Sequence, residues 1–162
     1  MAVLNIVKLG SSVLRKPAKE VEKVTKRINK LTKDMLETMY TSDGVGLAGP
    51  QVGVGLRLIV IDVGEGPLIL INPKITEYNG DMTDVEGCLS LPGVLGYVQR
   101  HAEVTVEGLD EKGRPIRVTG TDLLARALQH EIDHLDGVLF IDKAKGVSGL
   151  EELQEVSGHK ED

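Results

Sequence analysis

The spacing of apolar residues predicts an amphipathic α-helix in the first third of the chain. In residues 25–42 the apolar positions lie three or four apart, as one face of a helix requires: Ile28, Leu31, Met35 and Met39. Thr25 can cap the start of this helix, and Gly44 can end it. The preceding residues, 1–24, carry little periodicity and predict an extended or irregular arm.

The middle of the chain predicts short strands, followed by a second helix. Four aliphatic or β-branched runs suggest strands: residues 58–61, 68–71, 104–106 and 116–119. Turn-forming residues at 64–67 and 110–113 join them into two hairpins. The helical pattern returns over residues 122–135, with Thr121 or Asp122 as its N-cap and Gly137 after its end.

This order of helix, strands and helix predicts an α+β fold, because no strand–helix–strand alternation is present. We expect a single domain over residues 1–147, with antiparallel sheets packed around the second helix. Residues 148–162 form an acidic tail, which we expect to be partly disordered, with one short helix near 150–156.

Composition narrows the possible functions. The formal net charge of -6 argues against general binding to nucleic acids or to anionic membranes. Aromatic residues make up only 2% of the chain, too few for a surface that stacks on single-stranded bases. The single cysteine and the absence of a signal peptide or a spanning apolar run predict a cytoplasmic protein.

The second predicted helix contains an H-E-x-x-H motif at residues 130–134. Side chains four apart project from one helix face, so His130 and His134 can bind one metal ion. Glu131 can then accept a proton from a water on that ion. The alternatives are a chance match, a surface pair, or core histidines with satisfied nitrogens.

A catalytic metal site of this kind needs a third protein ligand and an open position. Cys88 is a candidate because it follows a glycine and has polar neighbours. A lone cysteine is more often an inert buried residue. The residues alone leave Cys88, Asp133 and Asp136 open as the third ligand.

A glycine-rich segment precedes the first predicted strand. Residues 44–49 match G-x-G-x-x-G, but a dinucleotide site needs a strand before the motif, and here a helix precedes it. The glycines are better suited to bringing the backbone close to a peptide-like ligand. Gln51 follows them, and its side-chain amide could stabilise an oxyanion, although an ordinary turn residue is the simpler interpretation.

Three segments in order resemble motifs of the peptide deformylase family, which removes the N-formyl group from newly made polypeptides: residues 44–51, 86–90 and 129–135. The similarity extends over residues 1 to about 145 and includes Ile71-Asn72-Pro73. Gly49 departs from it, since the family most often has alanine there. The tail also departs from those relatives that use a basic C-terminal helix at the ribosome, so we do not expect docking by that route.

The resemblance implies a role for each matching residue. Cys88, His130 and His134 would hold the metal, normally Fe²⁺, for which Zn²⁺, Ni²⁺ or Co²⁺ can substitute. Glu131 would be the base and proton shuttle. Gln51 and the backbone N–H of Leu89 would bind the formyl oxygen. Gly46 would form a hydrogen bond to the substrate backbone. Four further residues would shape the pocket for the first side chain of the substrate, normally methionine: Val45, Leu123, Arg126 and Ala127.

The implied partners are N-formyl-methionyl nascent polypeptides, with no membrane and no direct contact to nucleic acid. Two rival interpretations share the motif. A metallopeptidase would need a downstream His or Glu as third ligand, and the only histidine after the motif is His159, in the acidic tail. A structural metal site in a binding module would be closed by four protein ligands.

Overall fold

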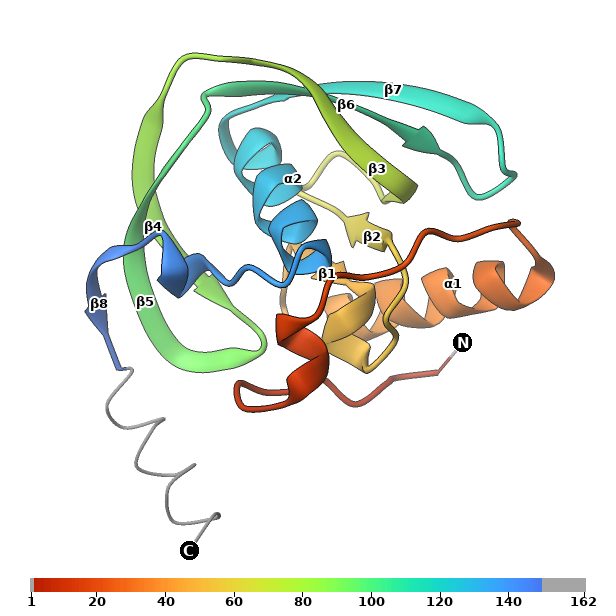
Figure 1. The fold of residues 1–162 in the computed structure, drawn as a ribbon, viewed down its shortest axis with the longest axis horizontal. Coiled ribbons are helices and arrows are strands. Elements are labelled where there is room, and N and C mark those ends of the chain that lie inside the picture. The colour runs from red at the N-terminus through yellow and green to blue at the C-terminus, as the bar shows by residue number, and fades with distance from the viewer. Residues whose placement is uncertain (1, 150–162) are drawn as a thin grey trace, which may run out of the picture.

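The computed structural model describes residues 2–149, and it has two β-sheets and two α-helices (Figure 1). The helices are α1 (Lys26–Thr41) and α2 (Asp122–Leu135). The first sheet has the order β1-β2-β3-β6-β7: Gly46–Ala48, Leu58–Ile61, Leu68–Asn79, Glu103–Leu109 and Pro115–Thr121. The second has the order β4-β5-β8: Met82–Cys88, Leu91–Arg100 and Lys145–Ser148. Short 3₁₀ turns lie at Ser12–Arg15, Gly49–Val52 and Phe140–Asp142.

All the strand pairings within the two sheets are antiparallel, which confirms the predicted α+β class. Figure 1 shows α2 in the middle of the molecule, with β4 and β5 to one side and β6 and β7 across its top. No helix in the described part of the chain is long and apolar enough to cross a membrane.

The two helices pack against side chains from opposite faces of strand β2. Its side chains alternate between the faces of the sheet. Ile59 and Ile61 pack in the core that contains Leu128 of α2, whereas Leu58 and Val60 pack in the core that contains Met39 of α1. The helices therefore cover opposite faces of the sheet near its β1 edge. A third cluster, including Phe140, lies against β5.

The predicted ends of both helices agree with the structure. The Thr25 side chain accepts a hydrogen bond from the Ile28 N–H, and the chain leaves α1 through a bond from the Gly44 N–H to the Met39 carbonyl. Thr121 is the N-cap position of α2.

The strand predictions were incomplete. The two predicted hairpins form, but the run at 68–71 continues to Asn79 as β3. Strands β1, β4, β5 and β8 were not predicted, because their sequences are short, polar or interrupted by glycine. The helix predicted near 150–156 and nearly all of the acidic tail lie outside the described residues.

Candidate metal centre

Helix α2 and the end of hairpin β4–β5 bring three metal-binding side chains together. The ligand atoms of Cys88, His130 and His134 all lie within 4.8 Å of one another. Cys88 is the last residue of β4 and pairs with Leu91 of β5, so the hairpin turn sets the position of its sulfur. His130 and His134 are 8% and 1% exposed, and Cys88 Sγ lies 3.3 Å from His134 Nε2.

This set fits a divalent ion. One thiol and two imidazoles are a common donor set for first-row metals. Among residues 2–149, no fourth His, Cys, Asp or Glu atom joins the cluster, so an ion held there would keep a coordination position for a further ligand. Neither Asp133 nor Asp136, the alternatives left open by the sequence, belongs to the cluster.

The electrostatics around the histidines also favour a cation. Burial lowers the pKa of His130, but the carboxylate of Glu131, with Cys88 and Glu86, outweighs burial and raises that pKa well above its usual value. The negative charge that would hold a proton there can equally stabilise a metal ion. Burial, reinforced by the charge of His130, lowers the pKa of His134, which keeps that imidazole in the neutral form that binds metals.

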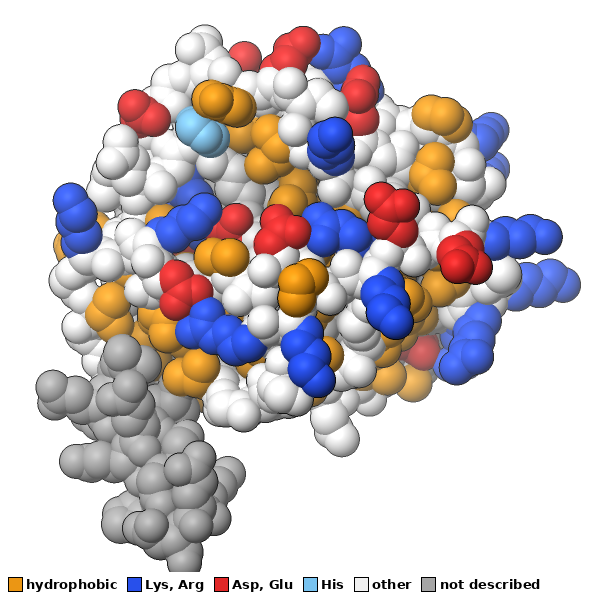
Figure 2. Space-filling view, in the orientation of Figure 1, with side chains coloured by type: hydrophobic (Ala, Val, Ile, Leu, Met, Phe, Trp, Pro, Cys, Tyr) orange, Lys and Arg blue, Asp and Glu red, His pale blue; other side chains and the backbone are white. Residues whose placement is uncertain are grey.

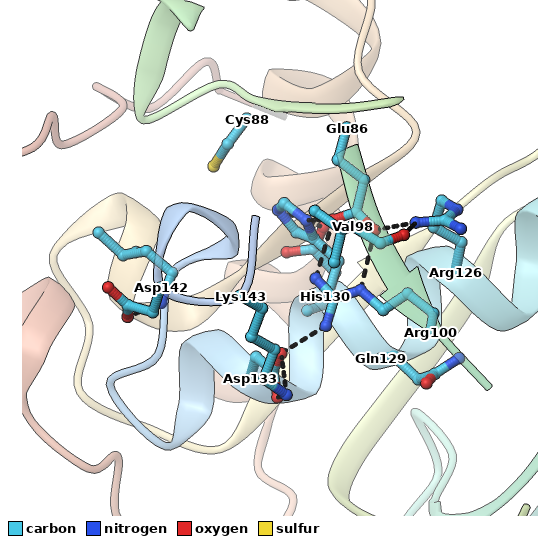
Figure 3. Close-up of polar contacts among 12 residues, drawn as sticks. Glu86, Cys88, Val98, Arg100, Arg126, Gln129, His130, Asp133, Asp142 and Lys143 are labelled. Carbon is cyan, nitrogen blue, oxygen red and sulfur yellow. Dashed lines mark hydrogen bonds and ion pairs between the residues drawn. The ribbon is translucent and has the colours of Figure 1, made fainter. Parts of the chain in front are cut away.

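Glu86 fixes the orientation of His130. Its Oε1 lies 2.8 Å from His130 Nδ1, and a carboxylate can only accept, so Nδ1 carries the proton. Nε2 is then the nitrogen that would exchange its proton for a metal ion. Figure 3 shows this pair together with the two arginines that hold Glu86.

Arg100 joins the two elements that supply the ligands. Its guanidinium donates twice to Glu86 on β4, at 2.8 Å each, and once to Asp133 on α2, at 2.6 Å. Arg126 donates to Glu86 and to the Val98 carbonyl. Burial alone would raise the pKa of Glu86, but Arg100 and His130 lower it far below its usual range. Glu86 therefore stays charged in a nearly dry site.

Glu131 lies beside the ligand cluster, 4% exposed, with Oε2 4.0 Å from His130 Nε2. Burial raises its pKa to about 7, against a smaller opposite effect of His130. Its Oε1 has no hydrogen-bond partner among the described residues. A carboxyl group that exchanges its proton near neutral pH, with a free oxygen, is suited to general acid–base catalysis.

The glycine-rich segment is packed directly against this carboxylate. A Cβ at Gly46 would lie 2.6 Å from Glu131 Oε2, so only glycine fits without displacing the acid. Two residues on, the Ala48 N–H donates to Gln51 Oε1 at 2.9 Å, which turns the Gln51 NH₂ toward Cys88 Sγ, 3.4 Å away. The motif thus positions an acid and an amide around one centre.

A cavity of about 560 Å³ opens over the cluster. Every predicted site residue except His134 lines it, and His134 lies in the ligand cluster behind it. Arg126 differs from the expectation in one respect. It lines the cavity, but its 5%-exposed side chain is committed to Glu86 and two backbone carbonyls.

Sequence reasoning missed the residues behind the ligands, Glu86 and Arg100. Both are charged yet buried, 5% and 4% exposed, which nothing in their local sequence indicates. The available signal was position: Glu86 lies two residues before Cys88, within the same short segment.

Comparison with known proteins places these features in context. A family model described as Polypeptide deformylase matches residues 3–149. The peptide deformylase of Pelotomaculum thermopropionicum is 57% identical over 150 residues, covering 93% of this chain and 97% of that protein. The crystal structure of the Synechococcus elongatus peptide deformylase in complex with actinonin has a TM-score of 0.86 at 47% identity, covering 96% and 85% of the two chains. That of the Ehrlichia chaffeensis enzyme with actinonin has a TM-score of 0.90 at 38% identity, covering 99% and 98%.

Proposed function

This chain belongs to the polypeptide deformylase family, metal-dependent hydrolases that remove the N-formyl group from newly made polypeptides, and we propose how its own residues carry out that reaction. The observation that carries the proposal is the meeting of three ligand atoms within 4.8 Å on the wall of an open cavity, with Glu131 beside them. The roles of Glu131 and Gln51 rest on distances in that site, and those of Leu89 and Gly46 rest on the family resemblance.

Cys88, His130 and His134 hold the ion, which we take to be Fe²⁺. A thiolate with two imidazoles suits Fe²⁺, Zn²⁺, Co²⁺ and Ni²⁺ alike, so the choice of iron rests on the family resemblance. When bound, the ion supplies Lewis-acid chemistry, which makes a water more acidic and polarises a carbonyl.

Glu131 moves the proton. Its carboxylate accepts a proton from the attacking water, whose oxygen then forms the bond to the formyl carbon. When the C–N bond breaks, Glu131 returns that proton to the amine of the leaving polypeptide. The products are formate and a free N-terminus. The pKa of about 7 supports this role, because the group can both accept and donate near neutral pH.

Gln51 and Leu89 stabilise the charge that develops on the formyl oxygen. The Gln51 Oε1 is held by the Ala48 N–H, so its Nε2 donates toward the ligand cluster from a fixed position. The backbone N–H of Leu89 is the second donor. Preorganised donors of this kind need no rearrangement as charge develops, which makes them effective in a water-poor site.

The substrate backbone lies beside β1, bonded at Gly46 in the manner of an added strand. The first side chain, methionine, enters the part of the cavity shaped by Val45, Leu123 and Ala127, with the aliphatic stem of Arg126 beside them. The apolar walls exclude water from the reacting group.

We propose that residues 1–147 are the catalytic domain and that 148–162 are an accessory acidic tail. The substrates are N-formyl-methionyl nascent polypeptides, which places the enzyme in the cytoplasm. The acidic tail offers no basic surface for docking at the ribosome.

The test is release of formate from a formyl-Met-Ala-Ser peptide by wild type, Glu131→Ala and the control Glu77→Ala, which alters an exposed carboxylate. We expect Glu131→Ala to lose at least about a hundredfold in kcat with its metal content unchanged, because general acid–base catalysis contributes about 10²–10⁴. The control should match wild type. Equal rates for all three proteins would remove Glu131 from the mechanism.

The same assay separates the rival functions. A metallopeptidase would cleave internal bonds of the peptide, whereas only formate and the intact deformylated peptide are expected here. A structural metal would be needed for folding, so Cys88→Ala would unfold the protein. We expect that variant to stay folded and to lose metal and activity together.

A further inference from the structure

The two donors proposed for the formyl oxygen lie in separate parts of the fold. Gln51 is in the 3₁₀ turn that follows β1, at the edge of the larger sheet, whereas Leu89 is in the turn between β4 and β5 of the smaller sheet. A donor stabilises a developing charge only if it points at that charge. Contacts that hold the two turns in a fixed arrangement therefore contribute to the reaction.

One short segment contacts both turns. It belongs to the N-terminal arm, residues 2–11, which crosses the lower part of the molecule in Figure 1, in red. The Val7 N–H donates to the Gln51 carbonyl at 2.7 Å, and the Leu9 N–H donates to the Ser90 carbonyl at 2.9 Å. Within three consecutive residues, the arm is thus bonded to the backbone of both turns.

Lys8 lies between these two anchors. Its ammonium group donates to the Leu89 carbonyl at 3.1 Å. The side chains of Ile6 and Lys8 line the cavity, whereas those of Val7 and Leu9 pack against the third core cluster. Alternate side chains thus face opposite ways, as in an extended strand. Because the backbone is anchored on both sides of Lys8, its side chain starts from a fixed point at the mouth of the cavity.

The Lys8 contact restricts the direction of the Leu89 N–H. A residue has only two soft backbone torsions, so holding the peptide groups on both sides of it leaves little freedom. On one side, Cys88 is paired with Leu91 of β5. On the other side, Lys8 holds the Leu89 carbonyl and the arm backbone holds the Ser90 carbonyl. Leu89 is therefore fixed at both ends, and Lys8 contributes directly to one of them.

Charge alone does not distinguish Lys8 from the other cations of the chain. Figure 2 shows Lys and Arg side chains interspersed with Asp and Glu over one face of the molecule. Position does distinguish it, because among the cations of residues 2–149 only Lys8 and Arg126 line the cavity. Arg126 is committed to Glu86 and to backbone carbonyls. Lys8 is thus the cation whose hydrogen bond leads to a proposed oxyanion donor.

We propose that Lys8 is a positioning residue for this reaction. Its ammonium group holds the Leu89 carbonyl so that the Leu89 N–H points at the formyl oxygen as charge develops there. The inference rests on the proposed function, because that function gives Leu89 its role as a donor. Lys8 acts through Leu89 rather than on the substrate itself. Because Val7 and Leu9 keep the arm in place, loss of the ammonium group should disturb only the alignment of this donor.

The experiment compares kcat and KM of wild type, Lys8→Met, Lys8→Arg and the control Lys16→Met on formyl-Met-Ala-Ser. Methionine keeps an apolar stem and lacks the donor, whereas arginine keeps donors at a similar reach. Lys16 is an exposed lysine of the same N-terminal region and does not line the cavity. Metal content and the urea midpoint are measured for each protein, so that a loss of the ion or of the fold is recognised.

We expect kcat of Lys8→Met to fall about three- to tenfold with KM nearly unchanged, the effect of one hydrogen bond that acts only in the transition state. Lys8→Arg should recover most of the rate, and Lys16→Met should match wild type. A wild-type kcat in Lys8→Met, or an equal loss in Lys16→Met, would overturn the proposal. A lower metal content or urea midpoint in Lys8→Met would assign Lys8 to folding and would overturn it as well.

A second substrate separates donor alignment from a general loss of activity. In a thioformyl peptide, sulfur replaces the formyl oxygen, and sulfur is a weak hydrogen-bond acceptor. In Lys8→Met the ratio of kcat on the formyl peptide to kcat on the thioformyl peptide should therefore fall about threefold or more. Equal losses on both substrates would leave Lys8 with a structural role only. Formate release by wild type and its loss in Glu131→Ala do not depend on these results, so failure of this inference and failure of the proposed function are distinguishable.

Discussion

Replacing Glu86 by Gln should both destabilise the protein and weaken its hold on the metal. Glu86 is 5% exposed and takes hydrogen bonds from Arg100, Arg126 and His130. Glutamine has the same shape as the glutamate side chain but no charge, and its NH₂ group would lie opposite a hydrogen-bond donor. Two guanidinium groups, with side chains 2% and 6% exposed, then lose their common counter-ion.

The magnitude follows from the remaining contacts. Breaking a buried ion pair from one side costs about 3–5 kcal/mol. Arg100 keeps Asp133, and Arg126 keeps the Val98 carbonyl, so we place the loss of unfolding free energy near the lower limit, about 3 kcal/mol. Metal affinity should fall about 10–100-fold, because His130 loses the group that fixes its ring.

The assay is urea unfolding of the metal-free protein, followed by chelator competition for the ion. Glu77→Gln is the matched control, since Glu77 pairs with Arg117 at 3.1 Å but both side chains are more than half exposed. It should cost less than about 1 kcal/mol. A Glu86→Gln protein with the stability of that control and unchanged metal affinity would refute the reasoning.

Three other changes test separate parts of the site. Gly46→Ala should lower kcat at least about tenfold with metal retained, because the new Cβ displaces the Glu131 carboxylate; kinetics with metal analysis would check it, and an unchanged kcat would contradict the packing argument. Gln51→Leu should lower kcat by about 10²–10³, as loss of an oxyanion donor does; it should also lower the unfolding free energy by about 1–3 kcal/mol, because the buried Ala48 N–H loses its acceptor. Partial burial would raise the pKa of the Asp142 carboxyl group, but the Arg15 guanidinium lowers that pKa below 3.8. The ionised carboxylate therefore stabilises the folded protein at neutral pH, and this stabilisation is lost as the pH falls below 3.8. The difference in urea midpoint between wild type and Asp142→Asn should therefore be measurable but small at pH 7 and shrink by pH 3.

The two helices could be predicted because their signals are local. Met35 and Met39 of α1 repeat with helical spacing, and both are fully buried. The His130 and His134 pair could be predicted for the same reason, since one helical turn brings them together whatever surrounds it. Pairings between distant segments leave no such trace. Strand β5 forms only because β4 and β8 lie beside it, and its sequence contains two glycines and a proline.

The third ligand marks the limit of what spacing can predict. Cys88 is 42 residues before His130, and only the packing of β4 against α2, secured by Arg100, brings its sulfur to the histidines. Residues alone made Cys88 an even choice against Asp133 or Asp136. Resemblance to a family identified the cysteine, and the geometry then agreed. Glu86 and Arg100 escaped both approaches, because a buried ion pair is defined by partners far apart in the chain.

Two of the three metal ligands come late in the sequence, and this determines when a new copy of the protein can bind metal during its synthesis. Both histidines are on the last helix of the described residues, after every strand of the larger sheet. During its own synthesis, a copy therefore has only one of the three ligands until α2 has been made. A copy that stops before α2 lacks both histidines, so it cannot assemble the centre. Metal content therefore reports chains that extend at least through α2.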